Sequence, residues 1–472
     1  MAEGDSNLNF KKIEFGKADA LNEKGLLVDG FLDVYGYIEK IIDGDKYFVV
    51  GQKGSGKSAI ASKLKIISEK EHNIEVNIQM LDDFDYDGFT GVIPGKDTPE
   101  IRYANTWEFL IALKLIEMYS ESEYNLEDKS ADPKELVKAL KKLGILPNTL
   151  KTVIHKFKLK DLKVDAKVAQ FTISHNKIEN RDIKRIIEST VSLFYKISPI
   201  KKHFIIMDGL DSVLSKRGNQ YEVLSSLIRS VNQINHKLSY LGIQSRVVVL
   251  CRKDVLDKLN DPNRSKYIQD SGIELNWFQT VNDIKESDLY KLINLRAKNS
   301  LKHDVDVMEQ FLPAKLYDRE TFRYLLDNTR YTPRDVIQLM NRIQSVSPAR
   351  GASLANIKDG INAYSDGYFL MEIKDSLVGM LSNDDIEDAF KAIRTMGKLE
   401  FSYKEFSEAV GGESKAYPML SALYIAGAVS NLEKDEDGKS YRVSVIRNPN
   451  SLFNEKKMIS VNMGLKKALM LH

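Results

Sequence analysis

The sequence YFVVGQKGSGKSAIASKLKIISEK, residues 47–70, joins an apolar run to a helix-compatible stretch through a glycine-rich loop. The run YFVV lacks polar alternation, as expected of a strand buried on both faces. The loop GQKGSGKS, Gly51–Ser58, fits G-x-x-x-x-G-K-[ST] in full. Glycines let backbone N–H groups converge on phosphate oxygens, and the helix that follows presents its positive dipole end. The stretch therefore predicts an α/β domain with a phosphate-binding loop.

Two side chains of this loop have predicted roles. Lys57 would reach the β- and γ-phosphates of a nucleotide, and the Ser58 hydroxyl would hold Mg²⁺. A glycine-rich turn that matches by chance is the alternative, and the strand before the loop and the helix after it make it the weaker one. The predicted nucleotide-binding residues are Gly51, Gln52, Lys53, Gly54, Ser55, Gly56, Lys57, Ser58 and Ala59.

A second motif is HFIIMDGLD, residues 203–211, an apolar run that ends in an acid. A strand tip can deliver a carboxylate beside the phosphate loop, so Asp208 is the candidate magnesium ligand, through a bound water. Asp211 could polarise the attacking water. An ordinary strand-to-turn segment is the alternative for this run alone, but the phosphate loop upstream favours the functional interpretation.

Two arginines are further candidates. Arg252 ends the apolar run RVVVLC and could sense the γ-phosphate and stabilise charge in phosphoryl transfer, or it could be an exposed residue that caps a strand. Arg334 follows Pro333 in YTPRDVIQLMNRI, at the start of a predicted helix. It could reach back to the nucleotide from a helical lid, or it could be a solvated first-turn residue.

The pattern of apolar runs predicts an α/β P-loop NTPase parallel sheet with a helical, basic insertion, followed by an all-α lid and a C-terminal winged-helix-like domain. We expect a P-loop core over 1–300 with the insertion at 121–199, a lid over 301–380 and the winged-helix-like domain over 381–472. The runs IEVNIQM and IELNW alternate with polar residues, so they are expected nearer the sheet edges. The predicted strands are Tyr47–Gly51, Ile74–Met80, His203–Asp208, Arg246–Cys251 and Ile273–Trp277.

The C-terminal segment has its own pattern. Asp384–Met396 and Tyr417–Val429 are predicted helices, and Val429–Leu432 and Tyr441–Ile446 flank the charged turn EKDEDGK. Helices followed by a charged hairpin are typical of a winged helix.

Composition excludes several classes of protein. With 43% hydrophobic and 29% charged residues, the 472-residue chain is neither disordered nor fibrous. Its single cysteine, Cys251, cannot form an internal disulfide, and the N-terminus lacks the apolar region of a signal peptide. No stretch is long and apolar enough to span a membrane. We therefore expect a cytoplasmic protein of two or three domains with no membrane partner.

Charge is local rather than global. The formal net charge is +2, yet residues 151–202 hold 13 Lys and Arg against 5 Asp and Glu, a net charge of +8. This segment could bind nucleic-acid phosphates, although a solvated helical face is the simpler alternative. Residues 381–472 are neutral, with 13 basic and 13 acidic side chains. Their apolar helix 414–429 therefore favours protein packing over base readout.

The quoted motifs resemble those of P-loop ATPases of the STAND and KAP kind, within the AAA+-like group that includes origin-recognition initiators. The resemblance lies in GQKGSGKSA, IIMDGLDSV and VVVLCRKD, and in the helical TPRDVIQLMN. The chain also resembles a set of bacterial P-loop ATPases with an FGKADA-like opening (Phe15–Ala20) and a closing segment like VNMGLKKALML (Val461–Leu471).

The resemblance implies an extra strand, RVVVLC, between the loop strand and the acid-ended strand. It further implies ATP and Mg²⁺ as ligands, nucleotide-dependent switching or assembly as a homo-oligomer, a separate effector protein, and in some relatives anti-phage defence. STAND proteins commonly carry Glu after the second acid, where this chain has Ser212. That difference favours a slow ATPase. A DNA-binding initiator or repair ATPase and a non-hydrolysing ATP-binding scaffold are the alternatives.

Overall fold

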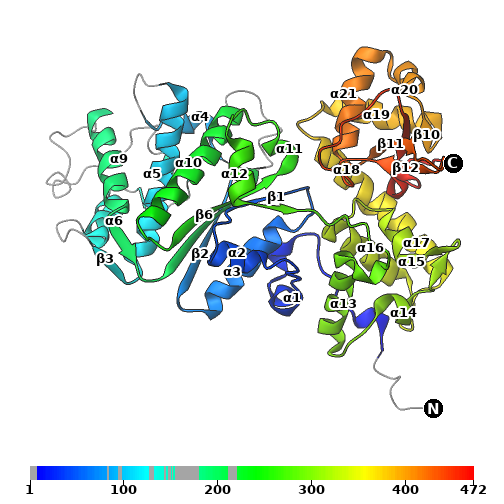
Figure 1. Ribbon diagram of the computed structural model, residues 1–472, viewed down its shortest axis with the longest axis horizontal. Helices are drawn as coiled ribbons and strands as arrows, with labels where there is room; N and C mark the ends of the chain where they lie inside the picture. Colours follow the sequence, from blue (N-terminus) through cyan, green and yellow to red (C-terminus); the bar gives the residue numbers. More distant parts are fainter. Residues whose placement is uncertain are drawn as a thin grey trace. The chain divides into compact units, whose positions relative to one another are not determined.

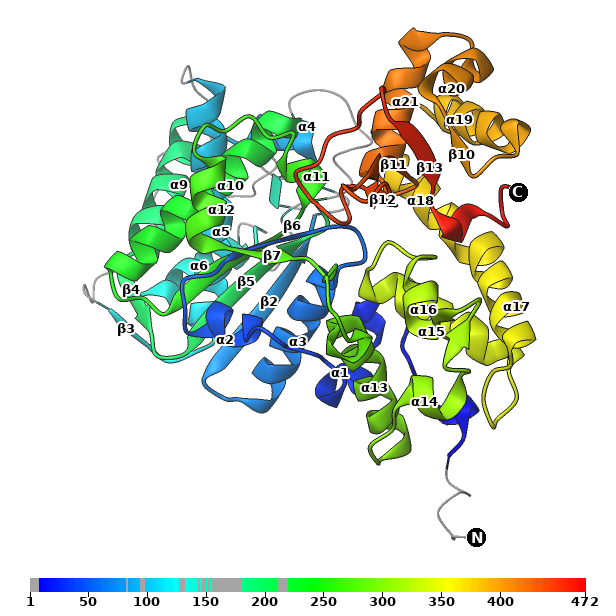
Figure 2. The same ribbon diagram turned by 45° about the vertical axis from the view of Figure 1, so that its right-hand side comes forward.

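The computed structural model describes residues 8–81, 84–93, 98–126, 132–142, 145–146, 150, 153–154, 180–210 and 220–472. The chain divides into two compact units, each described by itself below (Figures 1 and 2). The sheet unit comprises Gly36–Gly51 and Ile60–Glu274. The lid unit comprises Met1–Tyr35, Gln52–Ala59 and Leu275–His472, so it includes the phosphate loop.

The sheet unit is built on a five-stranded sheet with the order β2-β5-β6-β1-β7. Strand β1 pairs in parallel with β6, β6 with β5, and β5 with β2. This is the P-loop NTPase arrangement expected from the sequence, with β6 between the loop strand and the acid-ended strand. The two alternating runs form the edge strands β2 and β7, as predicted. The strands are β1 (Phe48–Gly51), β2 (Ile74–Met80), β5 (Lys202–Asp208), β6 (Ser245–Arg252) and β7 (Gly272–Leu275).

Helices cover both faces of this sheet, with α5, α9 and α10 on one face and α2 and α3 on the other (Figures 1 and 2). Helix α5 is buried nearly all round, because it packs against both α9 and α10. The described part of the predicted insertion contains α6, α9 and an antiparallel pair, β3 (Tyr124–Leu126) with β4 (Ile197–Pro199). The helices are α2 (Tyr37–Ile42), α3 (Lys57–Lys70), α4 (Tyr86–Phe89), α5 (Pro99–Ser120), α6 (Pro133–Lys142), α9 (Asn180–Phe194), α10 (Gln220–Tyr240), α11 (Lys253–Leu256) and α12 (Arg264–Ser271).

The lid unit begins with short helical segments and continues as a helical array. Thr332 caps the amphipathic helix α16, and Pro333 occupies its first turn, as the sequence indicates. Helices α17 and α18 are joined by a π-helical turn, Ser365–Phe369. The elements are η1 (Phe10–Lys12), η2 (Ala20–Asn22), α1 (Lys24–Asp29), η4 (Ile284–Glu286), α13 (Asp288–Leu301), α14 (Val307–Phe311), β8 (Lys315–Leu316), β9 (Arg319–Glu320), α15 (Thr321–Leu326), α16 (Pro333–Val346), α17 (Leu354–Tyr364) and α18 (Leu370–Leu377).

The C-terminal part of the lid unit has helices and a hairpin in the order expected of a winged helix. Its four-stranded sheet has the order β10-β13-β11-β12, and β11 and β12 form the predicted hairpin. Strand β13 was not predicted from the sequence. The elements are α19 (Asn383–Met396), β10 (Glu400–Phe401), α20 (Tyr403–Val410), α21 (Glu413–Ile425), β11 (Val429–Lys434), β12 (Ser440–Val443), β13 (Met458–Val461) and η6 (Met463–Leu465).

Three predicted boundaries were wrong. The strand predicted at Tyr441–Ile446 is β12, which ends at Val443. The helix predicted at Tyr417–Val429 is α21, which begins at Glu413 and ends at Ile425. It ends early because Gly427 adopts a left-handed conformation (φ 75°), and Pro418 is accommodated inside it. The strand predicted at Ile273–Trp277 ends at Leu275, so Trp277 lies in the segment that follows β7.

One continuous apolar core runs through the lid unit. The opening segment contributes Phe15, and the closing segment contributes Leu469; both side chains are fully buried. The core also joins α16 and α18 to α19 and α21. The lid and the winged-helix-like part therefore pack as one body. Among the described residues, no helix combines the length and apolar character needed to cross a membrane.

Candidate phosphate-binding site

The phosphate loop connects β1 to α3 and has the backbone that its glycines predict. Gly54 and Gly56 adopt positive φ angles of 85° and 99°, which side-chain-bearing residues rarely adopt. Ser55 N–H donates to the Gln52 carbonyl at 3.2 Å, closing a turn. The Lys57 ammonium lies 3.0 Å from the same carbonyl and is 8% exposed. The loop thus curls around its lysine at the N-terminus of a 14-residue helix.

This loop fits a phosphate chain on its own geometry. A Cβ at Gly56 would meet no atom of the described residues within 4 Å, so the backbone there leaves room beside it. Within the described part of the chain, the buried Ser55 hydroxyl has no hydrogen-bond partner, which is costly unless a ligand supplies one. The loop therefore favours binding of an anion, because it combines positive-φ glycines, a buried ammonium and a helix N-terminus.

Segments far away in the sequence hold the loop inside the lid unit. Trp277 Nε1–H donates to the Ser55 carbonyl at 2.8 Å, and the Arg334 backbone N–H donates to the Gly54 carbonyl at 3.3 Å. Gln52 Nε2–H donates to the Val445 carbonyl, which follows β12, at 3.2 Å. The loop therefore contacts the β7–α13 connection, the start of α16 and the C-terminal hairpin.

The approach of α16 to the loop is close. A Cβ at Gly54 would lie 3.1 Å from Thr332 Oγ1 and 3.2 Å from Arg334 Cβ. Only glycine satisfies both this spacing and the positive φ angle without movement of α16. The start of α16 is therefore fitted to the loop backbone.

A buried ion cluster lies beneath this contact. Asp335 is completely buried and accepts hydrogen bonds from Arg330 Nη2 at 2.7 Å and Nε at 2.8 Å. Burial opposes ionisation of both groups, but their mutual attraction holds the pKa of Asp335 below its ordinary value and that of Arg330 above it. Glu372 of α18 adjoins the pair and also lies 3.3 Å from Arg334 Nη1 and 3.5 Å from Lys53 Nζ.

In the sheet unit, the carboxyl ends of β1, β5 and β6 lie at one edge of the sheet. Gly51 is in register with Arg252, and Met207, one residue before Asp208, is in register with Val249. Asp208 is 8% exposed and accepts a hydrogen bond from the Gly209 N–H at 2.8 Å. The fold therefore brings Arg252 to the end of the strand next to β1, and Asp208 to the same end of the strand beyond it.

The Arg252 side chain is buried rather than exposed. Its Nε and Nη2 donate to the two carboxylate oxygens of Asp254 at 2.9 and 2.7 Å. A bidentate pair fixes the plane of the guanidinium. In this structure Arg252 is oriented by the residue two positions later.

Asp211 and Ser212 lie outside the described residues, as do Lys151, Lys156, Lys158, Lys160 and Lys163 of the basic segment. Among the residues that the structure does describe, no group of three or more His, Cys, Asp or Glu side chains could hold a metal ion.

Sequence reasoning missed Trp277 and Glu372. Trp277 was predicted to lie inside a strand, where its ring would have packed in the sheet. The chain has only two tryptophans, and this rarity was the one sequence feature that could have drawn attention to Trp277. Glu372 belongs to no motif and lies more than 300 residues from the loop it contacts. No local pattern could have identified it.

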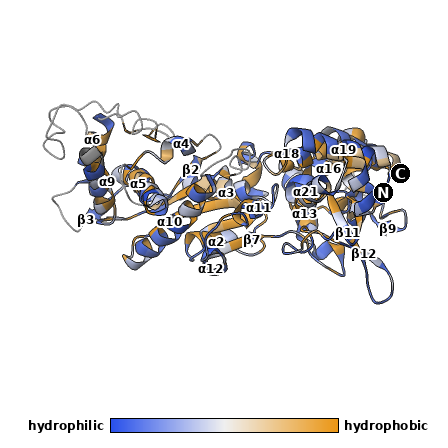
Figure 3. Ribbon diagram, turned by 90° about the horizontal axis from the view of Figure 1, so that it is seen from above, coloured by the Kyte–Doolittle hydropathy of each residue, from blue (hydrophilic) through white to orange (hydrophobic). Residues whose placement is uncertain are grey.

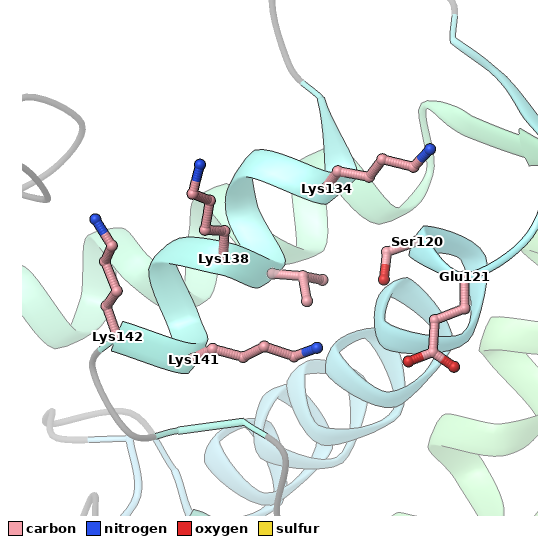
Figure 4. Close-up of a pocket in the computed structure, with 7 residues that line it drawn as sticks. Ser120, Glu121, Lys134, Lys138, Lys141 and Lys142 are labelled. Atoms are coloured by element: carbon pink, nitrogen blue, oxygen red, sulfur yellow. The ribbon is translucent and has the colours of Figure 1, made fainter.

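A second hollow, of about 570 Å³, lies in the sheet unit between α6 and the end of α5 (Figure 4). Four exposed lysines of α6 line it, opposite Ser120 and Glu121. Lys141 extends toward the end of α5, whereas Lys138 and Lys142 point out on the other side of the helix (Figure 4). Helix α6 carries hydrophilic residues beside its buried apolar ones (Figure 3), and its four lysines make this hollow an open, positively charged surface.

Comparisons with known proteins add two sequence similarities. Residues 287–370 match the family described as the FunZ-associated C-terminal helical domain, which corresponds to α13–α17 and the π-helical turn. The chain is 24% identical over 420 residues to the "Putative transposon gamma-delta 80.3 kDa protein" of Escherichia coli (strain K12). The alignment covers 85% of this chain and 53% of that protein, so the chain spans about half the length of this relative.

Three solved structures are similar at low scores. The Aeropyrum pernix Orc1 protein in complex with DNA is 12% identical with a TM-score of 0.38, covering 94% of this chain and 95% of that one. Cdc6p from Pyrobaculum aerophilum is 10% identical with a TM-score of 0.32, covering 95% and 92%. The Thermotoga maritima RuvB Holliday junction branch migration motor is 14% identical with a TM-score of 0.30, covering 97% and 95%. The P-loop NTPase fold of this chain is established by its own strand order.

Proposed function

We propose that this chain binds ATP with Mg²⁺ and hydrolyses it slowly, as a cytoplasmic switch ATPase of the STAND and KAP kind. The observation that carries the proposal is the phosphate loop before α3, with two positive-φ glycines, a buried Lys57 and a buried Ser55 hydroxyl that has no hydrogen-bond partner among the described residues. Backbone N–H groups and the helix dipole would bind the phosphates, and Lys57 would exchange the Gln52 carbonyl for phosphate oxygens.

The remaining residues have separate roles in the proposal. Asp208 would hold Mg²⁺ together with Ser58, and Asp211 would polarise the attacking water. Arg252, oriented by Asp254, would neutralise charge that develops on the γ-phosphate. Arg334 would contact the phosphates from the start of α16, since its backbone already contacts Gly54. The magnesium ion would supply charge neutralisation between the phosphates.

Phosphate release by the purified chain with Mg²⁺ and ATP tests turnover. The parent should release phosphate, Asp211→Asn should bind ATP but turn it over at least tenfold more slowly, and Lys57→Ala should do neither. Turnover by Lys57→Ala equal to that of the parent would refute the proposal. One bound nucleotide per chain with no phosphate release would instead support the non-hydrolysing scaffold.

The output of the switch is proposed to be assembly or control of a separate effector, in a pathway such as anti-phage defence. Support comes from the direct contact of the loop with both α16 and the C-terminal hairpin, which offers a path from nucleotide to lid. Light scattering with and without ATP on the phosphate-release sample would show a rise in mass if ATP drives homo-oligomerisation. A mass independent of nucleotide would contradict assembly.

Nucleic-acid binding is the second candidate function, favoured by the lysines of α6 (Figure 4). They precede the basic segment 151–202, and cations spaced along one helix suit a phosphate backbone. Removing four phosphate contacts should reduce the slope of log affinity against log salt by about 3 to 4, since each contributes roughly 0.9. The variant replaces the four α6 lysines with glutamine: Lys134, Lys138, Lys141 and Lys142.

Its matched control changes four exposed lysines of the neutral C-terminal part: Lys434, Lys439, Lys456 and Lys467. If only the control variant shows a smaller slope of log DNA affinity against log salt, the phosphate contacts belong to the winged-helix-like part instead. If the parent and both variants have equal slopes, neither surface is the DNA-binding site.

A further inference from the structure

Glu372 occupies an unusual position for an acid, between cations that border the phosphate loop. It lies in the first turn of α18, directly after the π-helical turn, and its side chain is 11% exposed. A single oxygen, Oε1, lies 3.3 Å from Arg334 Nη1, 3.4 Å from Arg330 Nη2 and 3.5 Å from Lys53 Nζ. Two segments of the lid unit, the loop and the start of α16, thus direct three cations at one carboxylate.

The cations around Glu372 are not equivalent. Arg330 is already paired in bidentate fashion with Asp335, so its charge is largely matched without Glu372. Arg334 lies 3.3 Å from Glu372, and Lys53 lies between Glu372 and Asp375, whose mostly exposed carboxylate is 3.9 Å from Lys53 Nζ. An exposed acid at that distance is screened by water, so Glu372 is the more strongly interacting acid beside Arg334 and Lys53.

These two cations are also those placed to meet nucleotide phosphates. Lys53 is a residue of the loop, and the Arg334 backbone contacts Gly54. Carboxylate and phosphate oxygens accept the same charge-assisted hydrogen bonds from arginine and lysine. A cation held by Glu372 must therefore change partner before it can bind a phosphate fully.

We propose that Glu372 is a positioning residue that competes with nucleotide phosphates for Arg334 and Lys53, so that nucleotide binding releases the first turn of α18. This proposal rests on the nucleotide binding proposed above and adds its regulation. Release would reach the winged-helix-like part, because Ile373 and Leu377 of α18 are fully buried in the shared core. Lys374 also forms an ion pair with Glu387 of α19.

Titration of Mg²⁺ and the slowly hydrolysed analogue ATPγS into four proteins tests the competition. Glu372→Gln keeps the shape but removes the charge, so it should bind about tenfold more tightly than the parent, equivalent to about 1.4 kcal/mol. Asp375→Asn makes the same charge change beside Lys53 at an exposed site and should change affinity by less than about twofold. Lys57→Ala should not bind.

The outcomes separate the two proposals. If the parent binds and Glu372→Gln binds equally or more weakly, the competition is refuted while nucleotide binding stands. If Asp375→Asn gains affinity for ATPγS to the same extent as Glu372→Gln, the gain comes from loss of any nearby negative charge, and the competition is also refuted. If the parent does not bind at all, both proposals fail.

Hydrogen exchange on the parent gives a test that needs no variant. With Mg²⁺ and ATPγS bound, the amides of Leu370–Leu377 should exchange about tenfold faster, whereas those of the loop should exchange more slowly. Unchanged or slower exchange in α18 at saturating nucleotide would overturn the proposal.

Discussion

Replacing Asp335 with asparagine should destabilise the lid unit strongly. The carboxylate is fully buried and accepts from the Arg330 backbone N–H at 3.0 Å, from Arg330 Nε and Nη2, and from the Tyr368 hydroxyl at 3.1 Å. Asp335→Asn leaves the Arg330 charge buried and poorly paired, which typically costs about 3–5 kcal/mol. Since Thr332 and Arg334 flank this pair, the start of α16 should open with it.

Hydrogen exchange of α16, followed by mass spectrometry, measures this opening. A loss of 3–5 kcal/mol corresponds to exchange faster by a factor of more than about a hundred. The control is the double variant Arg330→Met, Asp335→Leu, which removes both charges and should recover most of the lost protection. The reasoning would be refuted if Asp335→Asn raised the exchange rate of α16 by less than about fivefold. It would also be refuted if α16 exchanged as fast in the double variant as in Asp335→Asn.

The same pair gives a pH dependence with a fixed sign. The pKa of Asp335 is lowered in the folded chain from its ordinary value of 3.8, because attraction to Arg330 outweighs burial. A depressed carboxyl pKa stabilises the folded state above the ordinary value, and that stability is lost as the pH falls from 3.8 through the lower folded value. Protection of α16 in the parent should decline in that window, and Asp335→Asn should lack this component.

Three further predictions concern the loop, its contact with α16 and a helix cap away from the site. Trp277→Phe removes the hydrogen bond to the Ser55 carbonyl, worth about 1 kcal/mol, and should weaken ATPγS binding about fivefold in a calorimetric titration. The control is Trp107→Phe, which loses a similar hydrogen bond to the Val223 carbonyl in the sheet unit and should leave the affinity for ATPγS unchanged. Gly54→Ala should lower thermal stability more than Gly56→Ala. Both substitutions cost about 1–2 kcal/mol because alanine must adopt a positive φ angle, but only the Cβ at position 54 would also collide with the start of α16. Equal losses of stability would contradict the close approach of α16 to the loop. Ser402→Ala removes the capping box of α20 and should cost about 1 kcal/mol by chemical denaturation without changing nucleotide affinity; a changed affinity would contradict its separation from the site.

The sheet was largely predictable because its signals are local. Strands β1, β5 and β6 are buried on both faces and appear in the sequence as uninterrupted apolar runs. Their order also agreed with the family resemblance, and the edge strands were marked by polar alternation. The glycines of the loop are required by backbone angles, which a motif encodes directly.

Features set by distant contacts were not predictable. Strand β13 is short, and it is a strand because it pairs with β10 and β11, both of which lie well before it in the chain. The contact of Gln52 with Val445 joins residues almost 400 positions apart. Arg252 was weighed as an exposed capping residue, whereas the fold buries it and pairs it with Asp254. Such pairings depend on tertiary packing, which leaves no periodic trace in the sequence.

Calorimetric titration of Mg²⁺–ATP into the parent and into Lys57→Ala tests the central claim most directly. Lys57 is 8% exposed and its ammonium lies 3.0 Å from the Gln52 carbonyl of its own loop, a contact that it could exchange for a phosphate oxygen. The parent should bind one nucleotide per chain, and Lys57→Ala should lose binding by a factor of at least a hundred. Equal affinity in the two proteins, or no binding by a folded parent, would contradict the assignment of this loop as a nucleotide site.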